Sequence, residues 1–129
     1  MTRRPLSRDG NVVVNLILQT LKDVEGHLEI ASLLIKEEKI DSAALRCLSA
    51  LNAISDAEAQ IGVCDGIVSR RRSNTVTAKI RDCRREVWRL AIDIKKASPF
   101  IIRRSSQARS LLRSFLAYEW TDKISAQAM

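Results

Sequence analysis

Residues that break helices are scarce in this chain: its 129 residues include four glycines and two prolines. Because both residue types mark turns, the backbone has few places at which to reverse direction. Ala, Leu, Ile, Arg and Ser dominate, and 46% of the residues are apolar. That mixture favours long helices over strands. We therefore expect an all-α fold, a single bundle of four main helices built from antiparallel helical hairpins.

The spacing of apolar residues predicts an acidic first hairpin over residues 11–61. Apolar residues recur every three or four positions over about 11–38. Asp41 and Ser42 can cap a second helix that reaches about residue 61. Residues 1–10 are interpreted as a flexible basic arm, and residues 11–129 as one domain. Gly26 lies inside the first helix, which indicates close packing or a kink at that point.

A basic second hairpin is predicted over residues 75–121. The stretch from Gly62 to Thr75 is the main boundary, and the arginine run that starts at Arg70 is expected in this loop. Asn74 or Thr75 is the expected cap of a third helix over about 75–97, which Ser98-Pro99 ends. A fourth helix then starts within 99–107 and reaches about residue 121.

The two halves of the chain carry opposite charge. Residues 1–69 hold seven Lys/Arg and ten Asp/Glu, a balance of −3. Residues 70–129 hold fifteen Lys/Arg and five Asp/Glu, a balance of +10. An asymmetry of this size indicates a partner of opposite charge.

Arginines of the third predicted helix are the candidate site. Arg81, Arg85 and Arg89 are stacked at i, i+4 and i+8 on the face opposite the apolar stripe. Like charges at this spacing cost a helix about 0.2–0.5 kcal/mol per pair, a cost that nucleic-acid phosphate would turn into a gain. Such a surface holds phosphate without reading sequence. The candidate nucleic-acid-binding residues are Arg70, Arg71, Arg72, Arg81, Arg85, Arg89, Lys96, Arg103 and Arg104.

Other interpretations of the same residues remain open. The arginines can form a solvated face that Asp82 and Glu86 neutralise, and Trp88 can either stack on a base or pack. The chain can instead be a protein-interaction module, such as an adaptor, small chaperone or inhibitor, that offers a helical face to an acidic or apolar partner. The basic, amphipathic stretch 110–116 is also compatible with binding to an anionic membrane surface.

The sequence offers no support for catalysis. It has no glycine-rich phosphate loop, no nucleophile elbow and no paired carboxylates in an apolar setting. Cys47, Cys64 and Cys83 are odd in number and far apart, so we expect reduced thiols in a cytoplasmic protein, with no metal and no cofactor. No run of 18 apolar residues predicts a membrane span. The limited chain size, the apolar helices and the cluster of Tyr118 and Trp120 favour a homo-oligomer, although these two side chains could equally cover the end of the bundle.

Part of the first hairpin carries a family resemblance, within residues 16–55. The residues that carry it are Leu21-Lys22, Val24-Glu25-Gly26-His27-Leu28, Ile30-Ala31, Leu34-Ile35, Ile40-Asp41 and Ser49-Ala50. This text resembles the all-helical copper- and formaldehyde-sensing repressors. The resemblance implies helical oligomers that bind DNA. Lys39 stands where that family carries a cysteine ligand. The family's two later ligands would fall near Cys64 and Val68, and of these only Cys64 could bind a metal. No metal site of that type is therefore expected.

Overall fold

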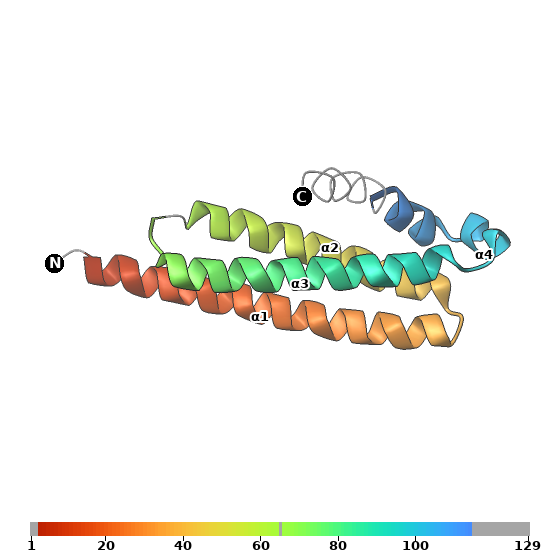
Figure 1. The fold of residues 1–129 in the computed structure, drawn as a ribbon, viewed down its shortest axis with the longest axis horizontal. Helices are drawn as coiled ribbons and strands as arrows, with labels where there is room; N and C mark the ends of the chain where they lie inside the picture. Colours follow the sequence, from red (N-terminus) through yellow and green to blue (C-terminus); the bar gives the residue numbers. More distant parts are fainter. Residues whose placement is uncertain (1–2, 65, 115–129) are drawn as a thin grey trace, which may run out of the picture.

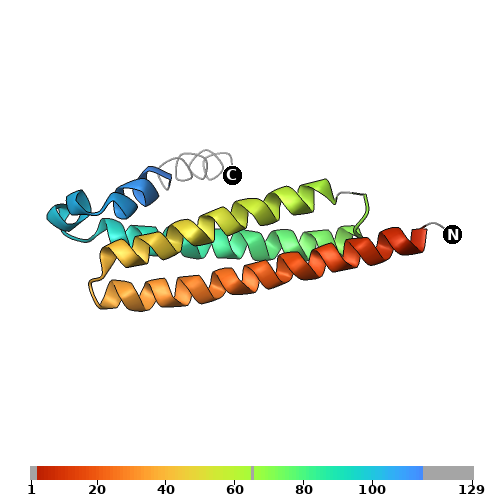
Figure 2. The same ribbon diagram turned by 180° about the vertical axis from the view of Figure 1, so that it is seen from behind.

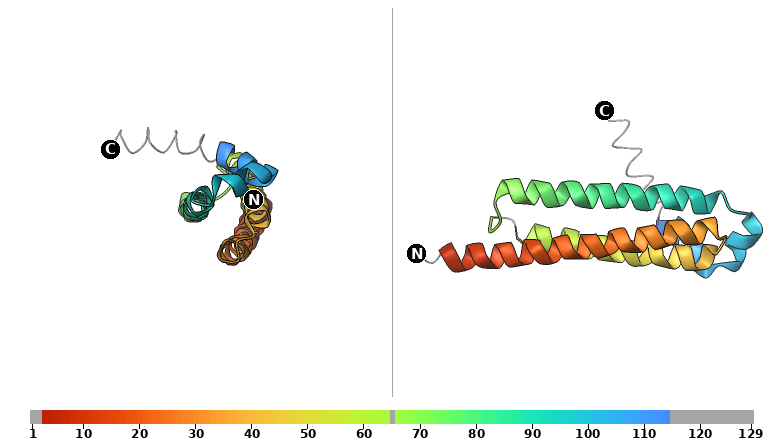
Figure 3. Two further views of the ribbon diagram at one scale, coloured as in Figure 1. Left: turned by 90° about the vertical axis from the view of Figure 1, so that its right-hand side faces the viewer. Right: turned by 90° about the horizontal axis from the view of Figure 1, so that it is seen from below.

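The computed structural model describes residues 3–64 and 66–114 and confirms the all-α bundle. Its elements are α1 (Arg3–Lys36), α2 (Ile40–Val63), α3 (Arg70–Lys95) and the short α4 (Pro99–Arg104). A further helical segment covers residues 106–114 and is called the C-terminal helix below. The three long helices run alongside one another, and α4 lies at one end of the bundle (Figures 1 and 2). Figure 3 shows α3 along one side of the α1–α2 hairpin.

One apolar core joins the three long helices. Each helix buries a stripe with three- and four-residue spacing, as amphipathic helices do. The part from α2 is rich in small side chains, because Ala43, Ala44, Ala50 and Ala57 are all buried there. Small residues let neighbouring helices approach closely, so α2 can pack closely against both α1 and α3. The largest fully buried side chains include Ile17, Leu21, Ile54, Leu90, Ile94 and Leu111.

The turn between α1 and α2 is closed by backbone hydrogen bonds. The N–H of Lys39 donates to the carbonyl of Leu34 at 2.9 Å, and the N–H of Glu38 donates to that of Ile35 at 3.0 Å. Glu38 has a φ of 62°, the left-handed conformation that ends many helices in this pattern. The expected cap at Asp41 and Ser42 is wrong, because α2 begins at Ile40 with no side-chain cap.

Two expected helix starts are also wrong, because α3 begins at Arg70 after a cap at Ser69, not at Asn74 or Thr75, and α1 begins before residue 11. The first helix begins at Arg3, inside the segment interpreted as a flexible arm. Pro5 lies in the first turn of α1. Because the N–H groups of a first turn have no partner within the helix, the N–H that proline lacks costs no hydrogen bond there.

A Cβ added at Gly26 would meet nothing within 4 Å, so the close packing expected there is not found among the described neighbours.

The predicted fourth helix is interrupted at Ser105. Pro99 opens α4, within the expected range for its start, and Ser98 caps it, but the backbone is extended at Ser105 with φ −103° and ψ 108°. Its hydroxyl donates to Asp41 Oδ1 at 2.6 Å and accepts from the N–H of Ala108 at 3.0 Å. Ser105 is therefore the N-cap of the C-terminal helix and fixes it to the start of α2. Tyr118, Trp120 and the end of the predicted helix lie outside the described residues.

We predict that Ser105→Ala lowers the free energy of unfolding by about 1–2 kcal/mol, because a buried cap and its bond to α2 are lost together. Urea denaturation followed by circular dichroism measures the change. The control is Ser106→Ala, at an exposed position one residue later. Equal effects of the two substitutions would contradict the assigned cap.

All three cysteines are buried and free, in agreement with the expectation of reduced thiols. Burial raises the pKa of Cys47 to about 12. In the unfolded chain the same thiol titrates near pH 9. The folded protein therefore keeps this proton over a pH range in which the unfolded chain loses it.

From this shift we predict a loss of stability in alkali. As pH rises above about 9, the unfolded state gains a thiolate that the folded state does not, so the free energy of unfolding falls by at most about 1.4 kcal/mol per pH unit through Cys47. The measurement is the unfolding free energy of the wild type and of Cys47→Ala between pH 8 and about 10.5, a range chosen around the unfolded pKa. If the free energy of unfolding depends on pH equally in the two proteins, Cys47 is not the source of the loss of stability.

Candidate nucleic-acid interface

The geometry of α3 separates its charges. The helix turns one face to the core through Val76, Ile80, Cys83, Val87, Leu90, Ala91 and Ile94. Six exposed basic residues lie on the opposite half of the helix and its C-cap, and together they are called the basic ridge. They are Arg70, Arg71, Arg81, Arg85, Arg89 and Lys96. At 1.5 Å per residue this ridge extends over about 39 Å.

Arg81 and Arg85 form the middle of the ridge. Both are exposed, and no carboxylate in the described part of the chain lies within ion-pair distance of either one. Their Cα atoms are one helical turn apart, so their charges repel each other. Arg89, the next residue of the stack, differs because it is hydrogen bonded to Glu86, with 3.1 Å between Nε and Oε1. That bond, and then the charge of Glu86, raise the pKa of Arg89.

The arginine run before the ridge lies on the helix and not in a loop. The loop expectation is wrong because α3 begins at Arg70, with the Ser69 hydroxyl accepting from the N–H of Arg72 at 3.3 Å. Arg72 turns toward α1, where it donates to Asn11 Oδ1 at 2.9 Å and to Asn15 Oδ1 at 3.4 Å. Arg72 is thus a helix-connecting residue, and the ridge starts with the other two arginines of the run.

The two arginines of α4 belong to the short helix at one end of the bundle, beyond the C-terminus of α3 (Figure 1). The guanidinium of Arg104 lies 4.2 Å from the centre of the Phe100 ring. Arg104 also lines a small pocket with residues 38–42 of the α1–α2 turn, at the end of the bundle. The structure therefore places Arg104 away from the middle of α3, while Arg103 is exposed on α4.

Arg84 is a second basic residue of α3, after Arg72, with a structural contact that the sequence did not predict. Arg84 forms an ion pair with Glu58 of α2, and its side chain is only 27% exposed. Trp88, which was expected either to stack on a base or to pack, is partly buried against the core. The helical position of Arg84, beside the apolar stripe, was the available signal, but its partner on α2 depends on how the helices pack.

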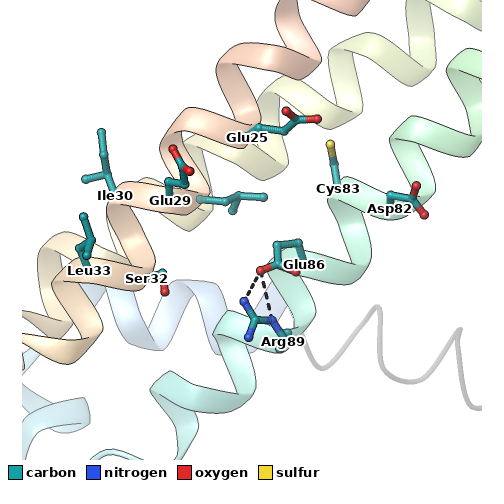
Figure 4. Close-up of a pocket in the computed structure, with 10 residues that line it drawn as sticks. Glu25, Glu29, Ile30, Ser32, Leu33, Asp82, Cys83, Glu86 and Arg89 are labelled. Atoms are coloured by element: carbon teal, nitrogen blue, oxygen red, sulfur yellow. Dashed lines mark hydrogen bonds and ion pairs between the residues drawn. The ribbon is translucent and has the colours of Figure 1, made fainter.

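Two acidic side chains of α3, Asp82 and Glu86, line a groove on the other flank of the helix, shown in Figure 4. This groove between α1 and α3 has a volume of about 590 Å³. Its charged lining is Glu25, Glu29, Asp82, Glu86 and Arg89, around the thiol of Cys83. Glu25 and Glu29 come from α1, so spacing along the third predicted helix could not place them beside Asp82 and Glu86.

Cys83 is not an activated nucleophile in this groove. Burial first, and then the negative charges of Glu25 and Asp82, raise the pKa of its thiol. The thiolate is the reactive form of cysteine, so this setting suppresses its reactivity. Among residues 3–64 and 66–114 no cluster of three or more His, Cys, Asp or Glu side chains could hold a metal ion. In the same part of the chain no helix has the length and apolar content needed to cross a membrane.

Comparison of the chain with protein-family models, with curated proteins and with solved structures gave no significant match.

The contacts predict that neighbouring arginines of α3 differ in their effect on stability. Arg84→Ala should lower the free energy of unfolding by about 1–2 kcal/mol, because its ion pair and its packed stem are lost. Arg81→Ala and Arg85→Ala should each change it by less than about 0.5 kcal/mol, since both side chains are exposed. Urea denaturation of the three variants tests the difference. A large loss for Arg81→Ala would show that the ridge is structural.

Proposed function

We propose that this protein is a non-enzymatic nucleic-acid-binding protein that contacts phosphates with the basic ridge of α3. The observation that supports it best is the pair Arg81 and Arg85, whose charges repel each other and have no ion-pair partner among the described residues. A phosphate backbone supplies closely spaced negative charge and releases its counterions when it is neutralised. Binding to a polyanion would therefore relieve the electrostatic repulsion between Arg81 and Arg85.

The charge distribution around α3 also supports a polyanion. Asp82, Glu86 and Asp93 lie on the flank of the helix next to the basic ridge, and two of them line the groove with α1. A duplex resting on the ridge would meet guanidinium groups first, with those carboxylates to one side. Phosphate contacts of this kind set position and affinity without selecting a base sequence. A regulatory role and a cytoplasmic location belong to this proposal, and the resemblance to DNA-binding repressors agrees with it.

The salt dependence of binding tests the proposal. The logarithm of the binding constant falls linearly with the logarithm of the salt concentration, and each lost phosphate contact makes this slope shallower by about 0.9 on a DNA duplex. We expect Arg81→Ala/Arg85→Ala to reduce that slope by about two and to weaken binding to all duplex sequences alike. Fluorescence anisotropy with a short labelled duplex at several salt concentrations provides the measurement.

A control variant separates local contacts from net charge. Lys36→Ala/Lys39→Ala removes the same formal charge at exposed positions in and beside the α1–α2 turn, outside the basic ridge. Its salt slope should remain that of the wild type. The proposal fails if the wild type does not bind, if its affinity is independent of salt, or if both double variants change the slope equally.

A second candidate function is a protein-interaction module, which the groove between α1 and α3 favours. Leu28, Ile30 and Leu33 add apolar surface to the carboxylates of this groove. A helix with basic and apolar residues has the complementary chemistry. Binding of that kind would depend on Glu25 and Asp82 and not on Arg81, which distinguishes it from the leading proposal.

The membrane-surface interpretation has less support. Of the apolar residues in the stretch 110–116, Leu111 is buried and Leu112 is partly buried against the core, while Phe115 and Leu116 lie outside the described residues. That face is already used for packing within the chain.

A further inference from the structure

The outer face of α1 carries a second periodic pattern, which the core does not use. Seven residues separated by alternating steps of four and three form one outward stripe, called the outer seam. They are Val12, Leu16, Gln19, Asp23, Gly26, Ile30 and Leu33. Steps of four and three make up a heptad repeat, the pattern by which one helix packs against another. The seam spans about 32 Å of helix at 1.5 Å per residue.

The apolar members of the seam are unusually exposed for a helix with a complete core face. Val12, Leu16, Ile30 and Leu33 are between 40% and 60% exposed. Ile30 and Leu33 also line the groove between α1 and α3 (Figure 4), where they remain 40% and 59% exposed, so α3 leaves them largely uncovered. Exposed apolar residues that repeat along one line mark an interaction surface more strongly than the same residues scattered singly.

Gly26 gives a second reason to expect a partner on this face. A glycine in the middle of a helix costs about 1 kcal/mol relative to alanine. No described neighbour accounts for that cost, because a Cβ at this position would meet nothing within 4 Å. Gly26 lies near the middle of the outer seam, where the absence of a side chain lets another helix come close.

We propose that the outer seam binds the outer seam of a second copy of this chain, with the two α1 helices antiparallel. A twofold dimer uses the same patch on both copies, and the seam has apolar residues at both of its ends. A parallel pair would stack Asp23 directly against Asp23 of the second copy. An antiparallel pair avoids that direct layer and places apolar ends together.

Charge selects one antiparallel register. When Leu16 of one copy lies opposite Leu33 of the other, Lys22 of each copy faces Glu29 of the other, giving two complementary contacts. Both side chains are exposed and lie on the same flank of the seam. A shift by one heptad, which puts Leu16 opposite Gly26, brings the two Lys22 side chains together instead. Opposite charges beside a helical seam set partner orientation in this way.

The first test is the solution mass of the full-length chain over a concentration series, by sedimentation velocity. The wild type should shift from monomer to dimer as concentration rises. Leu16→Asp and Leu33→Asp should each weaken dimerisation by about 100-fold or more, since each would replace a leucine–leucine contact with an unpaired charge. Asp23, the seam's own carboxylate, differs because it lies opposite Gly26 in this register and accepts a hydrogen bond from Gln19 at 3.3 Å. The matched control is Leu45→Asp on α2, where the leucine is 49% exposed and outside the seam, and it should dimerise as the wild type does.

The second test addresses the register. Lys22→Glu and Glu29→Lys should each weaken the dimer about 5- to 10-fold, and the double variant should restore it, because the contacts are re-formed with reversed charges. Circular dichroism confirms that each variant is folded. A wild type that stays monomeric, or a Leu16→Asp variant that dimerises like the wild type, overturns the proposal. Failure of the double variant to restore dimerisation overturns the antiparallel register.

Discussion

The rotation of α3 about its own axis is set by the burial of its apolar stripe, and the rest of the candidate site depends on it. Burying side chains such as Val87, Leu90 and Ile94 removes apolar area from water, each contributing on the order of 1.5–3 kcal/mol. Turning the helix by half a turn would expose all of them together. The positions of its charged residues follow from that constraint: arginines 81 and 85 face outward because the core lies behind them.

Side chains at the edge of that stripe connect the helices and are not available for a ligand. Arg84 pairs with Glu58 of α2, and Arg72 reaches two asparagines of α1. The C-terminal helix is attached in a similar way, through the bond between Ser105 and Asp41. The arginine-rich half of the chain is thus divided between residues that fix the packing and residues that remain exposed. The proposed nucleic-acid contact uses the exposed group.

The two proposed surfaces are on different helices and rely on different physical effects. The basic ridge of α3 relies on charge, which salt screens over roughly 8–10 Å at moderate ionic strength. The outer seam of α1 relies on exposed apolar side chains, whose association is driven by release of water. Because the two faces do not share residues, nucleic-acid binding and dimerisation can be altered separately by substitution.

The sequence by itself determined the helical class, the apolar stripes and the opposite faces of α3, because these depend on spacing along one helix. Arg81, Arg85 and Arg89 could be placed on one face from their i, i+4, i+8 positions alone. The tertiary structure decided what the sequence could not: the contact of Arg84 with α2, the position of Arg104 by the α1–α2 turn, and the break at Ser105. Each of these depends on residues far apart in the chain, and only the packing of whole helices brings such residues within hydrogen-bond distance.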